Sequence, residues 1–116
     1  MLGLNTACGQ GNFENADVDE FAKLVADTNV VVLDVRTAGE YAEGHLERAI
    51  NIDYNHDDFV EKAKAVLPLD KKIAVYCRSG RRSAGAAGKL GAEGYKLVNL
   101  KGGIIAWKEA NRLLTL

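Results

Sequence analysis

The sequence predicts an α/β fold with a small, mainly parallel sheet of four to five strands and helices on both faces. The first indication is the run Val30-Val31-Val32-Leu33-Asp34-Val35. A strand that is apolar on both sides belongs inside a parallel sheet that helices cover. The second is the alternation of strand-like and helix-like segments along most of the chain, which is typical of βα units. A length of 116 residues suits one domain with one core.

The helices and strands are expected in alternating order. Asp17, with Glu20 three residues later, forms a capping-box pattern that starts the first helix. Pro68 ends the third helix, and the alanines and glycines after Ser83 allow the fourth helix to pack closely against the sheet. The expected helices span about 18–27, 38–43, 59–67 and 83–90, with a fifth from about 104, and the expected strands span 30–35, 49–52, 72–76 and 95–100.

Residues 1–16 are predicted to be a flexible leader and residues 17–116 a single domain, because the glycines and asparagines of the leader show little apolar periodicity. Leu4-Asn5-Thr6-Ala7-Cys8-Gly9 loosely resembles the end of a bacterial lipoprotein signal. If the leader is a trimmed signal, the protein is periplasmic or lipid-anchored through Cys8; otherwise a cytoplasmic location is expected. No apolar run approaches the ~18 residues of a transmembrane segment.

Composition excludes several classes of function. Fifteen Lys and Arg against 16 Asp and Glu give a net charge of −1, so nothing attracts the whole molecule to nucleic acid or to an anionic membrane. The two cysteines are too few for a disulfide scaffold or a four-ligand zinc site, and no metal is expected. No long apolar stripe requires a partner, so a monomer is expected.

One loop gathers the residues that carry chemistry. Cys77 directly follows the 72–76 strand, and in open α/β sheets ligands bind beyond the carboxyl ends of the strands. Gly80 allows the backbone to turn N–H groups inward, and the following helix adds its positive end. These groups and three arginines favour the thiolate, so the pKa of Cys77 should be lowered, and the same loop should hold an oxyanion. The predicted nucleophile is Cys77, and the predicted substrate-binding residues are Arg78, Ser79, Gly80, Arg81 and Arg82.

Polar and aromatic residues outside this loop are predicted to be structural. Arg36 is expected to pair with Glu40 and so to fix the turn between a strand and a helix. Asp34 is expected to accept a hydrogen bond in that turn. Tyr76 is expected to pack in the sheet, and Trp107 is expected to be a core or loop-supporting side chain and not a platform for substrate. Cys77 itself has a structural alternative, because a lone cysteine at a strand end is usually a small buried apolar residue.

Three motifs, in order and together, resemble the rhodanese (sulfurtransferase) superfamily in its single-domain form. The resemblance covers about residues 17–112, nearly the whole predicted domain. The motifs are Leu33-Asp34-Val35-Arg36 continuing through Glu40-Tyr41, Gly44-His45-Leu46, Ala49 and Asn51-Ile52; the loop from Cys77 to Ser83; and Gly102-Gly103-Ile104-Ile105-Ala106-Trp107.

The resemblance implies a sulfurtransferase. Cys77 would take a sulfane sulfur from a small anionic donor such as thiosulfate, or from a persulfide, and become a persulfide itself. It would then pass the sulfur to a thiophilic acceptor, either a small molecule such as cyanide or a protein. No metal or organic cofactor is implied, because sulfur itself is the group that is carried.

Other functions use the same residues. A persulfide relay between proteins cannot be distinguished from a sulfurtransferase by sequence. A rhodanese-like module that only binds partners typically lacks the cysteine, which this chain keeps. A phosphatase or arsenate reductase is disfavoured, since phosphatases of related sequence have an arginine six positions after the cysteine, where this chain has Ser83.

Overall fold

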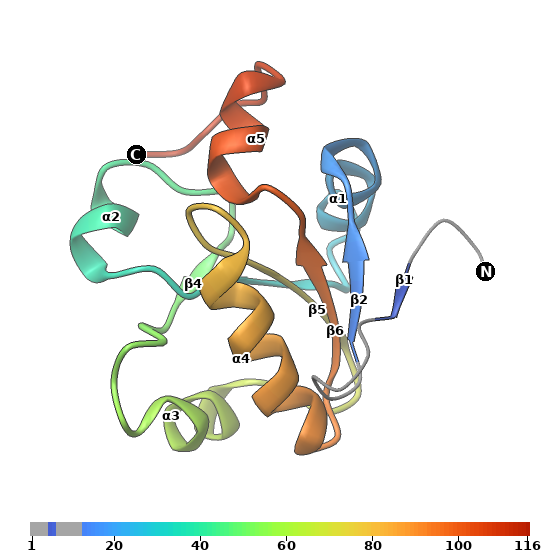
Figure 1. Ribbon diagram of the computed structural model, residues 1–116, viewed down its shortest axis with the longest axis vertical. Coiled ribbons are helices and arrows are strands. Elements are labelled where there is room, and N and C mark those ends of the chain that lie inside the picture. Colours follow the sequence, from blue (N-terminus) through green and yellow to red (C-terminus); the bar gives the residue numbers. More distant parts are fainter. Residues whose placement is uncertain (1–4, 7–12) are drawn as a thin grey trace.

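The computed structural model describes residues 5–6 and 13–116 and shows the predicted α/β fold (Figure 1). Its sheet has the strand order β1-β2-β6-β5-β3-β4. Within these residues, five strands run parallel and β1 pairs antiparallel with β2. The strands are β1 (Asn5–Thr6), β2 (Phe13–Ala16), β3 (Val31–Asp34), β4 (Ile50–Asn51), β5 (Lys72–Tyr76) and β6 (Lys96–Leu100). The helices are α1 (Val18–Val25), α2 (Ala38–Ala42), α3 (Phe59–Val66), α4 (Arg81–Ala92) and α5 (Gly103–Glu109).

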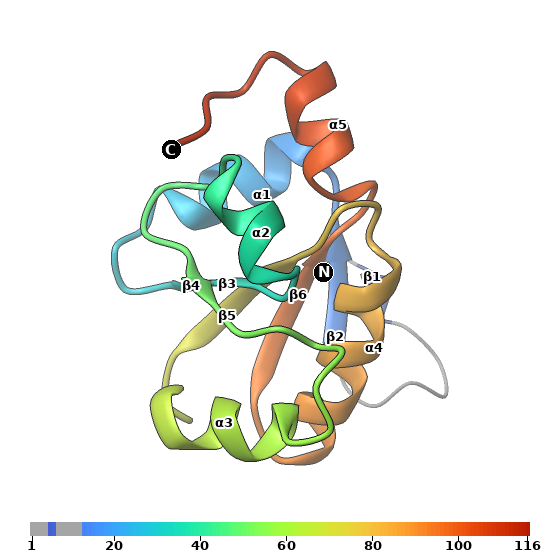
Figure 2. The same cartoon turned by 90° about the vertical axis from the view of Figure 1, so that its left-hand side faces the viewer.

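Helices cover both faces of the sheet, as the apolar strands require (Figure 2). On one face, Phe59 of α3 and Leu90 of α4 join a buried cluster with Leu33 of β3. On the other face, Phe21 of α1 meets Trp107 of α5 edge to face, with ring centroids 6.2 Å apart. Each such buried side chain contributes about 1.5–3 kcal/mol. The prediction that Trp107 is a core residue is confirmed.

Two capping boxes start helices beside the sheet. The Asp17 carboxylate accepts the N–H of Glu20 at 2.8 Å, and the Glu20 carboxylate accepts the N–H of Asp17 at 3.0 Å, as the sequence predicts. Thr37 and Glu40 form a second, unpredicted box at the start of α2. This second box places Glu40 at the edge of the sheet where the loop that begins at Cys77 lies.

The predicted leader boundary at residue 16 is wrong for residues 13–16. Phe13–Ala16 form β2, which pairs in parallel with β6, and both Phe13 and Ala16 are buried. The polar pair Glu14 and Asn15 separates the two buried residues, so this short strand lacks the alternation that predicts strands. Cys8, and the lipoprotein hypothesis that depends on it, lie outside the described residues. None of the helices in the described ranges combines the length and apolarity of a membrane crossing.

Candidate active site

Cys77 lies just beyond the carboxyl end of β5, at the centre of the sheet. The residue is buried, with 1% of its surface exposed. Its Sγ accepts the backbone N–H of Gly80 at 3.0 Å and the hydroxyl of Ser83 at 3.4 Å. Because β3, β4 and β6 run parallel to β5, the segments that follow these strands meet at the same edge.

Gly80 gives the loop its tight shape. Its backbone is left-handed, with φ +98°, and it forms the N-cap of α4. The helix therefore begins at Arg81, earlier than the predicted start at Ser83. A Cβ at Gly80 would lie 3.2 Å from the nitrogen of Gly102 and 3.3 Å from the oxygen of Leu100. Glycine is thus required here both by the backbone conformation and by the close approach of the next loop.

Opposing effects act on the pKa of the Cys77 thiol. Burial raises its pKa, because a buried site disfavours the charged form. The Ser83 hydroxyl and the N–H groups of Ser83, Gly80 and Ser79 act in the other direction, and together they lower the pKa of Cys77 below its ordinary value. The predicted direction is confirmed. The sequence indicates Ser83 only as a helix start, and the role of its hydroxyl as a donor to the sulfur was not predicted.

The first turn of α5 supports the loop from the neighbouring strand. The N–H of Ile104 donates to the carbonyl of Cys77 at 2.9 Å, and the N–H of Ile105 donates to the carbonyl of Arg78 at 3.1 Å. Gly103, with φ +62°, makes this contact possible, since a Cβ there would lie 2.3 Å from the Arg78 oxygen. The Gly102-Gly103 motif therefore fixes the backbone of the cysteine loop.

The three arginines of the loop have different surroundings. Arg82 forms two hydrogen bonds of 3.0 Å with the Glu40 carboxylate. That contact, above all the Arg82 hydrogen bond, lowers the pKa of Glu40 to about 2. Arg78 and Arg81 are exposed, and within residues 13–116 neither makes an ion pair. The positive charge available at the mouth of the loop therefore comes from Arg78 and Arg81.

A buried polar network lies beside the loop and corrects one prediction. Arg36 pairs with Asp34, with 2.7 Å between Nη2 and Oδ2, and not with Glu40. The hydroxyl of Tyr76 donates to Asp34 at 2.7 Å and accepts the N–H of Leu46 at 3.0 Å. Asp34 also accepts the Arg36 N–H within the turn, as predicted. Tyr76, which precedes Cys77, is thereby fixed by polar bonds as well as by packing.

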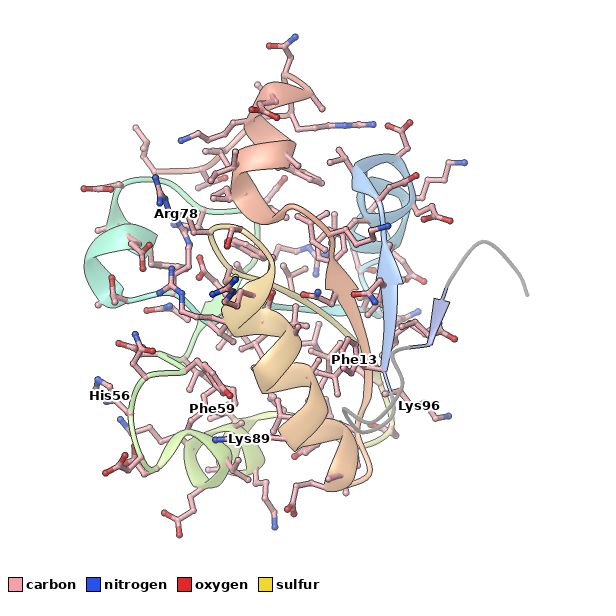
Figure 3. The ribbon with its side chains drawn as sticks, viewed as in Figure 1. Phe13, His56, Phe59, Arg78, Lys89 and Lys96 are labelled. Carbon is pink, nitrogen blue, oxygen red and sulfur yellow. The ribbon has the colours of Figure 1, made fainter. Side chains whose placement is uncertain are left out.

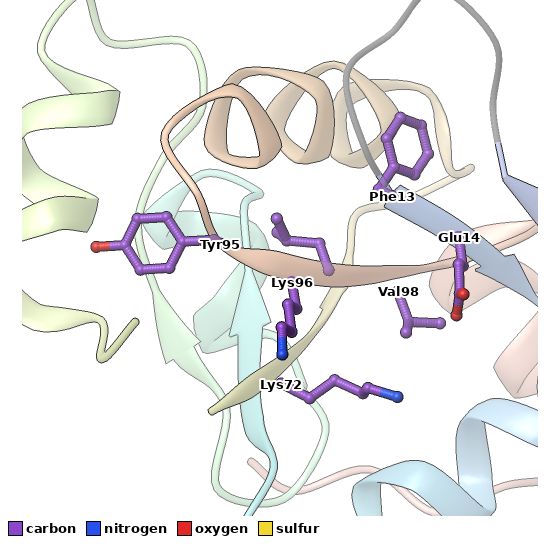
Figure 4. A pocket seen from close by; sticks show the side chains of 7 residues that line it. Phe13, Glu14, Lys72, Tyr95, Lys96 and Val98 are labelled. Atoms are coloured by element: carbon purple, nitrogen blue, oxygen red, sulfur yellow. The ribbon is translucent and has the colours of Figure 1, made fainter. Parts of the chain in front are cut away.

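Several surface hollows lie away from Cys77, and none of them is lined by residues 77–83. One of about 370 Å³ is found where β5 and β6 begin, beside Lys72, Lys96 and Glu14 (Figure 4). Figure 3 shows Arg78 and Lys96 at opposite sides of the molecule, in keeping with the parallel strands that separate them. Across residues 13–116, no cluster of three His, Cys, Asp or Glu side chains could hold a metal ion.

Sequence comparison matches residues 17–110 to the family model of the rhodanese-like domain. A protein named sulfurtransferase from Allochromatium vinosum is 36% identical over 93 residues, which cover 78% of this chain and 84% of that protein. Thiosulfate sulfurtransferase 18 of Arabidopsis thaliana is 37% identical over 105 residues, covering 80% of this chain and 76% of that protein.

Solved structures show the same fold. A rhodanese-related protein from Thermoplasma volcanium has a TM-score of 0.78 at 30% identity, with 88% of this chain and 97% of that chain covered. A rhodanese-like domain protein from Staphylococcus aureus has a TM-score of 0.70 at 31% identity, with 80% and 89% covered.

Substitution of Gly103 tests the support of the loop by α5. In Gly103→Ala, the left-handed backbone alone costs about 1–3 kcal/mol, and the Cβ collides with the Arg78 carbonyl. We expect a lower free energy of unfolding in urea and an altered rate of Cys77 alkylation by iodoacetamide, followed by peptide mass spectrometry that separates Cys77 from Cys8. The control is Gly39→Ala, where the nearest atom to a Cβ lies at 4.0 Å. Equal effects of the two substitutions would contradict the proposed support.

The lowered pKa of Glu40 predicts a pH-dependent contribution to stability. Glu40 titrates near 4.5 when unfolded and near 2 when folded. Its contribution is therefore complete above about pH 4.5 and is lost as the pH falls through this range toward 2. We expect the difference in unfolding free energy between wild type and Glu40→Gln to shrink over that interval in urea titrations. A difference that stays constant down to about pH 2 would show that the Arg82 pair does not stabilise the Glu40 carboxylate.

Proposed function

The chain belongs to the family of rhodanese-like domains, and from that premise we propose that it is a sulfurtransferase that carries a sulfane sulfur on Cys77. The observation that carries the proposal is the set of donors at Sγ, with the Gly80 N–H at 3.0 Å and the Ser83 hydroxyl at 3.4 Å. A persulfide anion on Cys77 needs such donors, as an oxyanion does in other enzymes. The names of the relatives from Allochromatium and Arabidopsis support transfer of sulfur.

The proposed reaction has two balanced steps. The Cys77 thiolate attacks the outer sulfur of thiosulfate; the new bond to Sγ forms as the S–S bond of thiosulfate breaks, and sulfite leaves with the electron pair. Cys77 then carries a persulfide anion. A thiophilic acceptor, either cyanide or the thiolate of a protein, attacks the outer sulfur and releases the Cys77 thiolate. Neither step needs an external oxidant, a metal or a proton.

Two exposed arginines are proposed to bind the anionic donor. Arg78 and Arg81 lie on the loop of Cys77 and make no ion pair within residues 13–116. A guanidinium can hold two oxygens of a sulfonate-like group at once. Arg82 was predicted as a third residue that binds the donor, but both terminal nitrogens of its guanidinium donate to the Glu40 carboxylate. We therefore assign donor binding to Arg78 and Arg81.

The site gives less support to phosphoryl transfer. The position six residues after Cys77 holds Ser83, which is fully buried and donates its hydroxyl to the sulfur. To bind the outer oxygens of a phosphoryl group, the site would need an arginine guanidinium at that position. A persulfide relay between proteins would use the same persulfide on Cys77, and it differs in taking the sulfur from a protein donor and passing it to a protein acceptor.

Formation of the persulfide is tested by intact mass. Incubation with thiosulfate is expected to add one sulfur atom to the wild-type chain, and cyanide is expected to remove it. Cys77→Ala should show no gain while keeping the wild-type circular dichroism spectrum. A gain of one sulfur atom by Cys77→Ala would overturn the assignment of Cys77 as the residue that carries the sulfur. A wild-type chain that takes up no sulfur from thiosulfate, despite a reactive Cys77, would remove thiosulfate as donor.

The binding role of the two free arginines is tested by kinetics. Loss of one charge-assisted hydrogen bond of about 1.4 kcal/mol corresponds to about tenfold in affinity. Arg78→Ala and Arg81→Ala are each expected to raise KM for thiosulfate by about that factor, with a smaller effect for an uncharged sulfur donor. Lys96→Ala removes an exposed cation at the other end of the strands and should leave KM unchanged. Equal changes for charged and uncharged donors would argue against electrostatic binding.

A further inference from the structure

We propose that Asn99 is a positioning residue for Cys77 and that it acts through the turn at Gly80. The side-chain amide of Asn99 joins β6 to the cysteine loop, and it holds Gly80 where the Gly80 N–H donates to the sulfur. The proposal rests on the proposed function only in taking Cys77 as the reacting group. It concerns the ionisation of the thiol, which does not depend on the identity of the sulfur donor.

Gly80 is held on both sides of its Cα atom. Its N–H donates to Sγ of Cys77 at 3.0 Å. Its carbonyl accepts the N–H of Ala84 at 3.2 Å, in the first turn of α4, and Nδ2 of Asn99 at 3.4 Å, from β6. The bond from Asn99 is long, so we expect it to orient the Gly80 carbonyl and to add little to stability. Asn99 thus ties one hydrogen-bond donor of the sulfur to the sheet.

The orientation of the Asn99 amide is set by two oxygens. Nδ2 also donates at 3.1 Å to Oδ1 of Asn15, the residue beside Asn99 on the neighbouring strand β2. An amide turned the other way would place Oδ1 against the Gly80 carbonyl oxygen, so only the observed orientation allows Asn99 to donate to the loop. Asn15 supports that orientation, and through it β2 is connected to the site.

The Asn99 side chain is unfavourable for stability at this place. It is 3% exposed, and its Oδ1 has no hydrogen-bond partner among the residues that the structure describes. Its neighbours on this face of the sheet are apolar, since Phe13, Leu97 and Val75 belong to one buried cluster. An apolar side chain would suit this surface without leaving a polar atom unpaired. Packing therefore does not account for an amide at position 99, whereas the contact with Gly80 does.

Replacement of the amide pair by apolar residues should therefore separate reactivity from stability. In Asn99→Leu, and in the double variant that adds Asn15→Leu, Gly80 loses its hydrogen bond to β6, and its N–H is held less firmly against the sulfur. The pKa of Cys77 should then rise, because one of the donors that favour the thiolate is weakened. The urea midpoint of the double variant should stay at or above that of wild type, since both amides are replaced together.

The experiment measures the rate of Cys77 alkylation by iodoacetamide, an uncharged reagent, against pH. Peptide mass spectrometry of the full chain separates Cys77 from Cys8. We expect the midpoint of the rate profile to move up by about 0.5–1 pH unit in Asn99→Leu and in the double variant, which is part of the effect of one hydrogen bond to a charged group.

Asn51→Leu is the matched control. The Asn51 amide donates to the backbone carbonyls of Asp34 at 3.1 Å and Arg36 at 2.9 Å, and in the described part of the chain it makes no hydrogen bond to the Cys77 loop. Its loss should lower the urea midpoint, because two backbone carbonyls lose a donor. The midpoint of the alkylation profile should stay at the wild-type value.

An alkylation midpoint of Asn99→Leu that stays at or falls below wild type, while circular dichroism shows an intact fold, would overturn the proposal. Equal upward shifts in Asn99→Leu and Asn51→Leu would do the same, since they would reflect general loosening of the sheet. Failure of both the single and the double variant to fold would show that the amide serves stability, against the proposal. The measurement uses no sulfur donor, so a chain that takes up no sulfur from thiosulfate would contradict only the proposed function.

Discussion

A buried cysteine whose proposed role requires negative charge on its sulfur is the constraint on which the rest of the site depends. Cys77 is almost fully removed from water, and an anionic sulfur there is stable only if nearby donors replace the lost hydration. The chain supplies these donors mostly from its backbone, through a left-handed Gly80 and the first turn of α4. Backbone donors have fixed positions, so they need no ordering when charge develops on the sulfur.

The same constraint explains why distant parts of the sequence converge on this loop. A backbone that turns its N–H groups toward the sulfur turns carbonyls away from it, and buried carbonyls need partners of their own. The N–H groups of Ile104 and Ile105, in the first turn of α5, donate to the carbonyls of Cys77 and Arg78. Gly103 leaves the space for that contact. The Gly102-Gly103 motif thus provides hydrogen-bond donors for the backbone carbonyls of the Cys77 loop.

Local patterns in the sequence were sufficient for the central strands of the sheet and for the position of Cys77 at the end of β5. The apolar run of β3, the capping box at Asp17 and the cysteine after β5 each signal their role within a few residues. Contacts between residues far apart in the chain were not predictable. Arg82 pairs with Glu40, 42 residues away, whereas sequence reasoning paired Glu40 with its neighbour Arg36. The strand Phe13–Ala16 was missed for a local reason, because the polar pair Glu14 and Asn15 between its two buried residues gives no strand-like alternation.

The pairing of Glu40 with Arg82 also bears on turnover. In the proposed reaction the donor thiosulfate and the released sulfite are both small anions, so each additional free arginine beside the loop would bind product as well as donor. Binding that is equal for both lowers KM without raising the rate, and it slows release of the product. The carboxylate of α2 binds Arg82 and so leaves only Arg78 and Arg81 of the loop to attract the donor in the proposed reaction.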